Sequence, residues 1–157
     1  MTTRPDTLAE LFETVSLGAP ENAVAFVMWR IVHRYQREID RALEPLGLTH
    51  LQFTTLAMAA WLSRGGDAVT QAKLAQAAEI SPMQVSHMVK ALEQKEMLER
   101  TRGSHDSRVN QLAVTRRGVA ALRKAMPVVL DRQRELFGPE GAPGGSLLRA
   151  LREIEKR

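Results

Sequence analysis

The sequence has no cysteine among its 157 residues, which excludes a disulfide framework, a thiolate metal site and a cysteine nucleophile. Its longest apolar runs, at residues 23–29 and 56–62, are far shorter than the roughly 20 residues that span a bilayer. The first residues also lack the long apolar stretch and the small-residue cleavage site of a secretory signal. We therefore expect a cytoplasmic protein that makes no use of a membrane.

Acidic residues are scarce in one part of the chain. The formal net charge is +4 and the isoelectric point is near 10.0. Between Arg100 and Lys124 there are seven Arg and Lys residues but one acid, Asp106. This local excess fits a polyanionic partner, although modest positive charge is also common in proteins that bind no nucleic acid.

Patterns that carry enzyme chemistry are absent from the sequence. There is no Gly-rich phosphate loop, no Ser-His-Asp pattern and no pair of acids at catalytic spacing, so we expect no enzyme, no catalytic residue and no cofactor. The four histidines show no zinc-ligand spacing, which favours ordinary helix-surface or DNA-facing roles over a regulatory metal site. These histidines are His33, His50, His87 and His105.

Apolar residues recur at helical spacing through most of the chain. The pattern predicts helices near residues 8–15, 21–45, 49–62, 80–98, 115–137 and 146–157, and a small helix that Thr70 caps. After Leu98, two extended arms flank a polar tip around residues 103–107, which indicates a β-hairpin. The fold class is therefore mainly α with one small β-hairpin.

The stretch from Ile80 to Leu98 predicts a helix with two different faces. Ser81 suits the N-cap, Pro82 suits the first helical position, and Gln84 completes a capping-box pattern. Apolar residues at three-to-four spacing form one stripe, whereas the other face is polar and carries no carboxylate before Glu93. The stripe contains Val85, Val89 and Leu92, and the polar side contains Met83, Gln84, Ser86, His87, Lys90 and Gln94.

A helix, a tight turn, a second helix and a basic hairpin follow one another in the order of a winged helix-turn-helix module. DNA repels carboxylates through its phosphates, and its major-groove base edges both donate and accept hydrogen bonds. The polar, acid-poor face fits that partner. The alternative is that these side chains are ordinary surface polar groups, or that the module binds another protein and no longer binds DNA.

The stretch from residue 69 to residue 118 resembles the MarR-type (multiple antibiotic resistance) bacterial transcriptional regulators. The wing carries the most specific match, a family Asp-x-Arg signature followed by Leu-Thr-x-x-Gly or a close equivalent. It occurs here as Asp106, Ser107 and Arg108, and then Val114, Thr115 and Gly118. Many members place glycine at the end of the recognition helix, where this chain has Glu96, so a left-handed backbone there would be strained.

This resemblance implies a function and its site residues. The helix from Ser81 to Gln94 would read the major groove of a double-stranded operator, and Arg108 would enter the minor groove. Asp106 would either orient the wing by pairing with Arg100, Arg102 or Arg108, or merely serve the turn. The expected DNA-binding residues are Ser81, Met83, Gln84, Ser86, His87, Lys90, Gln94, Arg102, Asp106 and Arg108.

The resemblance also implies assembly and regulation. Residues 1–47 and 115–157 would form a helical dimerisation region around a winged helix-turn-helix at 48–114, giving a homodimer on a pseudo-palindromic operator, most often a repressor. Family members often bind small aromatic or phenolic anions between these parts. Candidate ligand residues, whose simpler explanation is a place in the core, are Trp29, His33, Phe53, Met58 and Trp61.

Overall fold

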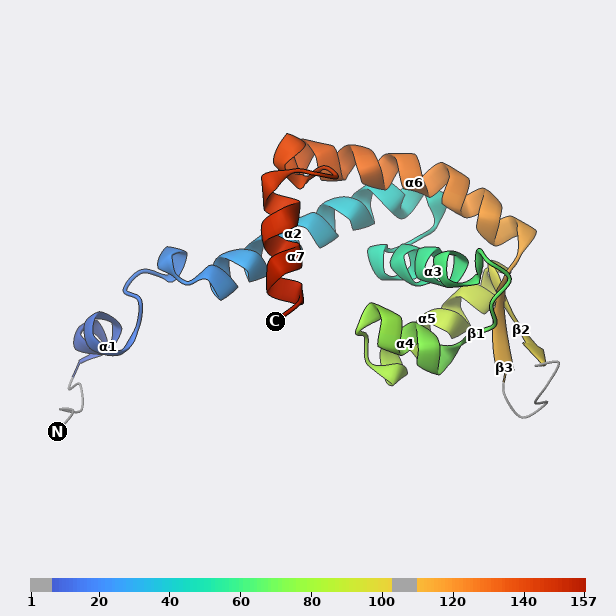
Figure 1. Ribbon diagram of the computed structural model, residues 1–157, viewed down its shortest axis with the longest axis horizontal. Coiled ribbons are helices and arrows are strands. Elements are labelled where there is room, and N and C mark those ends of the chain that lie inside the picture. Colours follow the sequence, from blue (N-terminus) through green and yellow to red (C-terminus); the bar gives the residue numbers. More distant parts are fainter. Residues whose placement is uncertain (1–6, 103–109) are drawn as a thin grey trace. The chain divides into compact units, whose positions relative to one another are not determined.

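The computed structural model describes residues 7–102 and 110–157, without the side chains of residues 102 and 110. Residues 1–38 and 39–157 form two compact units, and the elements are labelled in Figure 1. The helices are α1 Leu8–Val15, α2 Val24–Leu43, α3 His50–Ser63, α4 Gln71–Ala78, α5 Pro82–Gln94, α6 Arg116–Phe137 and α7 Ser146–Glu155. Short 3₁₀ turns are η1 Pro20–Asn22, η2 Glu44–Leu46 and η3 Pro139–Gly141. The strands are β1 Val69–Thr70, β2 Leu98–Arg102 and β3 Asn110–Val114.

The first unit contains α1, η1 and most of α2. A capping box starts α1, because Thr7 accepts a hydrogen bond from the Glu10 amide and the Glu10 side chain accepts one from the Thr7 amide. No residue of α1 is buried within the chain. In α2 the rings of Trp29 and His33 lie 4.2 Å apart between centroids.

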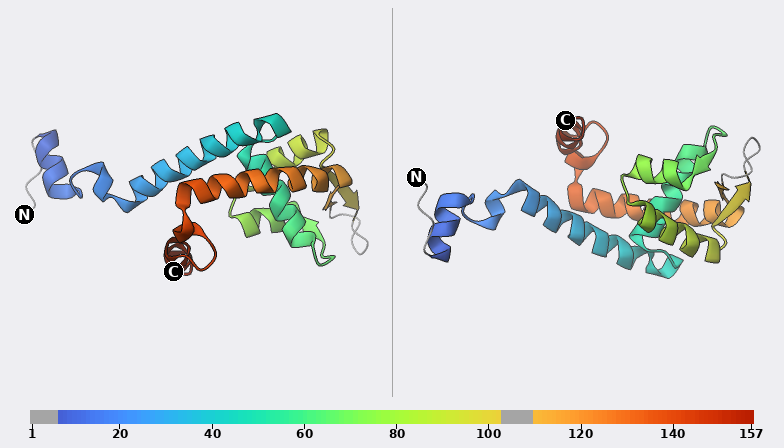
Figure 2. Two further views of the ribbon diagram at one scale, coloured as in Figure 1. Left: turned by 90° about the horizontal axis from the view of Figure 1, so that it is seen from above. Right: turned by 90° about the horizontal axis from the view of Figure 1, so that it is seen from below.

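The second unit joins three helices to a small sheet. The strand order is β1-β3-β2, all antiparallel, with Val69 opposite Leu112 and Arg100 also opposite Leu112 on the other side. Helices α3, α4 and α5 pack together beside this sheet, and α6 runs from β3 across α3 (Figures 1 and 2). This arrangement confirms the predicted winged helix-turn-helix fold and its mainly helical class.

Apolar side chains from α3, α4, α5, the end of α2 and the sheet form the core of the second unit. The stripe predicted on α5 is buried, with Val85, Val89 and Leu92 at most 1% exposed. The other large side chains that are fully enclosed are Ile39, Leu43, Leu56, Leu74, Val69 and Leu98. Because α5 buries only this stripe, its polar side is left for solvent or a partner.

The compact units do not follow the division predicted from the sequence. That division separated residues 48–114 from the flanking helices, whereas the second unit begins at Ile39 and continues through α6 and α7 to Arg157. The predicted division concerns function rather than compactness, and it stays a prediction.

Candidate nucleic-acid interface

The turn between α4 and α5 begins the candidate interface. Helix α4 ends at Glu79, which adopts a left-handed backbone with φ 51°, and the Ile80 amide then donates to the Ala75 carbonyl at 3.1 Å. Ser81 follows as the N-cap of α5, and its hydroxyl accepts from the Gln84 amide at 3.2 Å. The turn between α4 and α5 is therefore short, and the caps of the two helices are separated by one residue, Ile80.

The predicted capping box at this helix start is only half formed. The Gln84 side-chain oxygen contacts the Ser81 hydroxyl at 3.3 Å, with the hydroxyl as donor. In a full capping box the side chain three residues on would instead accept from the N-cap amide. Gln84 is exposed, so its amide group lies at the surface where a partner can reach it.

The polar face of α5 is open along its whole length. Met83 is 69% exposed, and every other candidate on this helix also falls among the exposed residues. The candidates brought together on this face are Ser81, Met83, Gln84, Ser86, His87, Lys90 and Gln94. One helix thus presents hydroxyl, amide, imidazole and ammonium groups on a surface that can donate and accept hydrogen bonds.

The one carboxylate within α5 forms an ion pair with a residue of the neighbouring strand β2. Glu93 pairs with Arg100 of β2, with Glu93 Oε1 3.1 Å from Arg100 Nε. A negative charge on this helix would repel phosphate, and the adjacent guanidinium offsets it. Arg100, one predicted partner of Asp106, thus contacts Glu93, and its predicted pairing with Asp106 stays a prediction because Asp106 lies outside the described residues.

The end of α5 is fixed to the start of α6 through Glu96. This residue adopts the left-handed conformation with φ 57°, so the chain keeps the left-handed turn despite the strain expected for a residue with a Cβ atom. Its carbonyl accepts from the Thr115 hydroxyl at 2.6 Å, and its carboxylate lies 2.9 Å from Arg117 Nη1. Thr115 also caps α6 by accepting from the Gly118 amide at 3.0 Å.

Gly118 lets α6 approach this turn closely. A Cβ atom at position 118 would lie 2.2 Å from the Met97 carbonyl oxygen, which is backbone and cannot swing away. Thr115 and Gly118 of the wing motif therefore have structural roles. Thr115 bonds the start of α6 to the turn after α5, and Gly118 lacks the Cβ atom that would clash with that turn.

Strands β2 and β3 form the arms of the predicted hairpin, with Arg102 opposite Asn110. The tip residues Asp106 and Arg108 lie outside the described residues, as does His105. For Arg102 the structure describes the backbone in β2 and not the side chain. The hairpin is confirmed, and the roles assigned to its tip stay predictions.

The five predicted ligand residues divide between the two units. Trp29 and His33 belong to the first unit, where Trp29 is 56% exposed and its carbonyl lies 2.8 Å from His33 Nδ1. The other three lie on α3. There Phe53 is buried in the core, whereas Trp61 is 59% exposed and lies beneath the Arg64 guanidinium.

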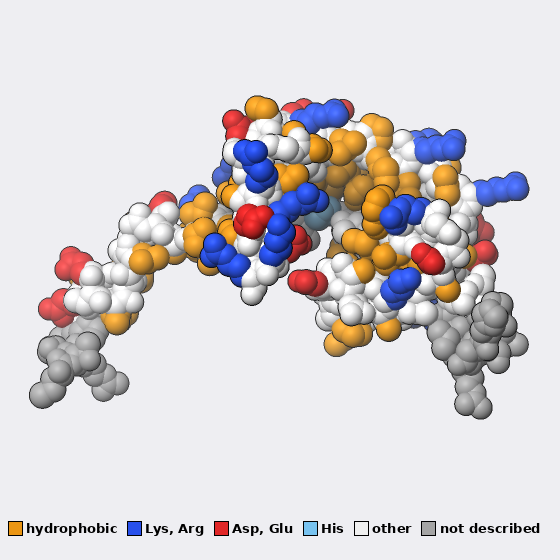
Figure 3. Space-filling model, viewed as in Figure 1, with side chains coloured by type: hydrophobic (Ala, Val, Ile, Leu, Met, Phe, Trp, Pro, Cys, Tyr) orange, Lys and Arg blue, Asp and Glu red, His pale blue; other side chains and the backbone are white. Residues whose placement is uncertain are grey.

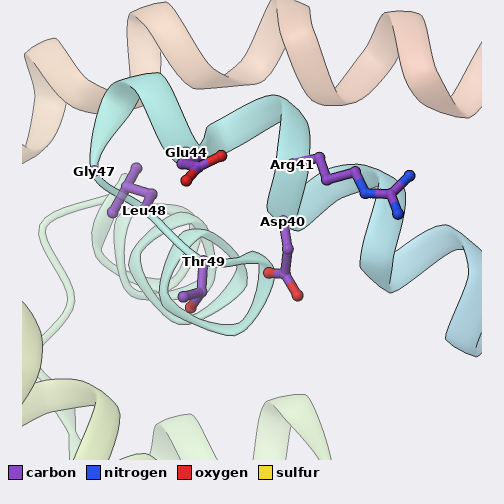
Figure 4. A pocket seen from close by; sticks show the side chains of 6 residues that line it. All are labelled: Asp40, Arg41, Glu44, Gly47, Leu48 and Thr49. Carbon is purple, nitrogen blue, oxygen red and sulfur yellow. The ribbon is translucent and has the colours of Figure 1, made fainter.

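A pocket of about 390 Å³ lies where α2 ends and α3 begins (Figure 4). None of the predicted ligand residues lines it. The carboxylate of Asp40 accepts from the His50 amide at 2.6 Å, which caps α3. Burial lowers the pKa of the His50 imidazole, and the nearby Asp40 charge opposes part of that shift. The residues that line the pocket are Asp40, Arg41, Glu44, Gly47, Leu48 and Thr49.

The described residues 7–102 and 110–157 also bear on metal binding and membrane insertion. No group of three or more His, Asp or Glu side chains there could hold a metal ion. No helix of that part is long and apolar enough to cross a membrane.

Hydrophobic side chains reach the surface along α6 (Figure 3), where Val119, Met126 and Leu130 are each more than 40% exposed.

Comparison with known proteins gives consistent matches. Residues 48–109 match the model of the MarR family. The chain is 31% identical over 139 residues to the uncharacterized HTH-type transcriptional regulator YdcH of Bacillus subtilis (strain 168), covering 88% of this chain and 94% of that protein.

Solved structures share the fold. The regulator MosR of M. tuberculosis in complex with DNA is 25% identical, with a TM-score of 0.67 over 85% of this chain and 92% of that one. CouR from Rhodococcus jostii RHA1 bound to p-coumaroyl-CoA is 23% identical, with a TM-score of 0.75 over 88% and 92% of the two chains. With its helix-turn-helix, its wing motif and these relatives, the chain belongs to the MarR family.

Proposed function

We propose that this protein is a DNA-binding transcriptional regulator, acting as a homodimeric repressor on a pseudo-palindromic operator. The exposed polar face of α5 carries the proposal, because it offers donors and acceptors while its one carboxylate, Glu93, is paired with Arg100. Membership of the MarR family supports DNA binding and regulation of transcription. Homodimerisation and repression are the finer parts of this proposal.

Each chain supplies one recognition helix. In this proposal Gln84, Ser86, His87 and Lys90 contact base edges of the major groove, and Ser81, Met83 and Gln94 border the same groove. Arg102 and Arg108 of the wing contact the backbone and the minor groove, and Asp106 orients the tip.

A dyad-symmetric operator requires a second copy of α5, about 34 Å away on the same face of the duplex. The terminal helices, at residues 1–47 and 115–157, are proposed to join the two copies. Unpartnered apolar side chains on α6 and α7 support this assignment. These side chains are Val119, Met126, Leu130, Leu147, Leu151 and Ile154, all exposed in the single chain.

A small aromatic or phenolic anion is proposed to release the operator. In the first unit Trp29 and His33, and separately in the second unit Met58 and Trp61 of α3, offer apolar and polarisable contacts for such a ligand. The pocket at the α2–α3 junction suits it less well, because two carboxylates, Asp40 and Glu44, line it against one guanidinium, Arg41. We propose Trp29 and His33, and separately Met58 and Trp61, as ligand contacts, and no ligand role for that pocket.

The competing proposal is a winged-helix protein-interaction module without DNA binding. A carboxylate-rich recognition face would favour it, and the face of α5 is not acidic. The relative YdcH carries the name of a transcriptional regulator rather than of an enzyme. The observations therefore favour DNA binding.

Selection of bound fragments from genomic DNA of the source organism tests the proposal. The full-length protein should enrich fragments that share a dyad-symmetric motif with half-sites about one helical turn apart. Enrichment that follows only fragment length or base composition would contradict sequence-specific regulation and support the interaction module.

A further inference from the structure

Lys95 forms a polar bridge between the end of the recognition helix and the start of α3. It is the C-cap residue of α5. Its ammonium donates to the carbonyl oxygen of Gly47 and, at 2.6 Å, to the side-chain oxygen of Gln52. Both acceptors are neutral, and they lie 48 and 43 residues away in sequence. The lysine is therefore used for directional hydrogen bonds rather than for a surface ion pair.

Both acceptors are themselves held in place. Gly47 ends η2 in the left-handed conformation with φ 67°, and its amide donates to the Glu44 carbonyl at 2.9 Å. Gln52 belongs to the capping box of α3, where its oxygen also accepts from the Thr49 amide at 3.3 Å. Lys95 thus docks on a rigid turn and a capped helix start.

Apart from the Glu93–Arg100 ion pair to β2, the other described contacts between α5 and its neighbours are mainly apolar. Val85, Val89 and Leu92 bury the inner stripe of the helix, and such contacts favour burial without fixing one orientation strongly. Hydrogen bonds weaken steeply when their distance or angle changes. The bonds of Lys95 therefore resist tilting of α5 relative to α3.

A small tilt matters at the other end of the helix. Gln84 lies about 16 Å along the axis from Lys95 at a rise of about 1.5 Å per residue. Tilting α5 by about 10° about its midpoint would shift Gln84 and Lys95 by roughly 1.4 Å each in opposite directions, which is enough to weaken the hydrogen bonds at both ends.

We infer that Lys95 is a positioning residue for DNA readout: its bonds to Gly47 and Gln52 hold α5 at the angle at which its polar face matches base edges. The inference rests on the proposed function. It assigns Lys95 no contact with DNA, which separates it from the candidate residues of the exposed face.

The test compares variants on two duplexes, an operator recovered by the genomic selection and an unrelated sequence of equal length. Lys95→Met removes the bonds and keeps the apolar stem. Gln52→Met removes one acceptor and leaves the lysine charge, whereas Gln52→Glu keeps an acceptor for both Lys95 and Thr49. Lys73→Met is the charge control, because Lys73 lies on α4 and its bond to the Ala68 carbonyl is local.

Lys95→Met and Gln52→Met should each lower the ratio of operator affinity to unrelated-DNA affinity by roughly two- to thirtyfold, the range for residues that act without touching the ligand. Gln52→Glu should keep the wild-type ratio. Lys95→Met should leave the salt dependence of binding unchanged, because the variant still neutralises the same phosphates. Thermal unfolding confirms that each variant is folded; if Lys95→Met is not, the two Gln52 variants decide.

A wild-type ratio in both Lys95→Met and Gln52→Met would overturn the inference and leave the proposed function intact. Equal loss of affinity on both duplexes in Lys95→Met, with a reduced salt slope, would also overturn it, because Lys95 would then contact phosphate directly. A wild-type protein that does not distinguish the two duplexes would overturn the proposed function and this inference together.

Discussion

At the scale of single residues, two glutamates with left-handed backbones flank the recognition helix. Glu79 precedes α5 with φ 51°, and Glu96 follows it with φ 57°. Such a conformation costs a residue with a Cβ atom roughly 1 kcal/mol or more relative to its preferred regions. The fold accepts this cost at both ends of the helix on which the proposed function depends.

Replacing Glu96 by glycine should stabilise the protein. Glu96→Gly relieves the left-handed strain and keeps the bond from the Thr115 hydroxyl to the carbonyl of residue 96. The pair with Arg117 is removed, but both side chains are more than half exposed and such pairs contribute little. We expect the free energy of unfolding to rise by about 1 kcal/mol, measured by chemical denaturation.

Glu96→Ala is the matched control, because alanine also removes the ion pair but keeps the strain. It should not stabilise the protein. If Glu96→Gly is no more stable than Glu96→Ala, the left-handed backbone at residue 96 does not destabilise the protein.

His50 should make stability depend on pH. Burial lowers the pKa of its imidazole in the folded protein below the usual 6.5. The unfolded chain therefore binds the proton more readily, and the free energy of unfolding should fall as the pH drops below about 6.5. Above that value both states hold a neutral imidazole, so the contribution is constant.

His50→Gln should remove this part of the pH dependence. The measurement is the unfolding free energy of the wild type and of His50→Gln from pH 8 to pH 5. Below about pH 6.5 the wild type should lose more stability than the variant as the pH falls. Parallel curves throughout would mean that burial does not shift the pKa of His50.

At the scale of elements, much of the candidate interface was predictable because its signals are local. Ser81 and Pro82 marked the start of α5, the spacing of Val85, Val89 and Leu92 marked its buried stripe, and Thr115 marked the start of α6. Capping and periodicity act over a few residues, so a single sequence contains them. Glu96 in place of glycine suggested strain in a left-handed turn, and the structure contains that turn with φ 57°.

Other features depend on contacts that a single sequence does not encode locally. The bridge from Lys95 to Gly47 and Gln52 joins residues more than forty positions apart, and no periodicity indicates it. The Glu93–Arg100 pair and the close approach of Gly118 to Met97 likewise require the helix–hairpin packing to be known. Phe53 and Trp61 share α3, yet only packing decides that one is buried and the other exposed.

The wing should contribute affinity without sequence preference. If Arg108 contacts phosphate and the minor groove, Arg108→Ala should weaken binding to most sequences alike. It should also flatten the salt dependence by roughly one unit for each phosphate that is no longer neutralised, hence about two in a symmetric dimer. The measurement is operator affinity across a salt series.

Arg123→Ala provides the control, because Arg123 is an exposed arginine on α6 outside the proposed DNA interface, and the dimeric state of the variant is checked alongside. Its slope should equal that of the wild type. If Arg108→Ala keeps wild-type affinity while the dimer is intact, the wing does not touch DNA and the interaction module becomes the better proposal.

At the scale of the whole molecule, operator binding depends on assembly. Helix α7 exposes Leu147, Leu151 and Ile154 in the single chain, and we propose that a second copy covers them. Ending the chain after Phe137 should weaken dimerisation and operator binding together, measured by sedimentation at low protein concentration and by DNA titration. A truncated protein that stays dimeric at low concentration would remove α7 from the interface.

A finer version of this test leaves the chain at full length. Leu151→Glu places a charge among the exposed apolar side chains of α7 and should favour the monomer. Arg149→Glu changes the charge of an exposed residue of the same helix, and it should leave the dimer largely intact. Similar dissociation in both variants would indicate a general charge effect rather than a specific interface.

The central claim is that the exposed face of α5 reads base edges, and base-preference measurements on Gln84→Ala and His87→Ala test it most directly. Affinity is measured for the operator and for every single-base variant of one half-site. Each substitution should cost about 1 to 3 kcal/mol on the preferred site and relax the preference at one position per half-site, leaving the others unchanged. Base preferences identical to the wild type in both variants, with dimer and fold intact, would contradict the claim.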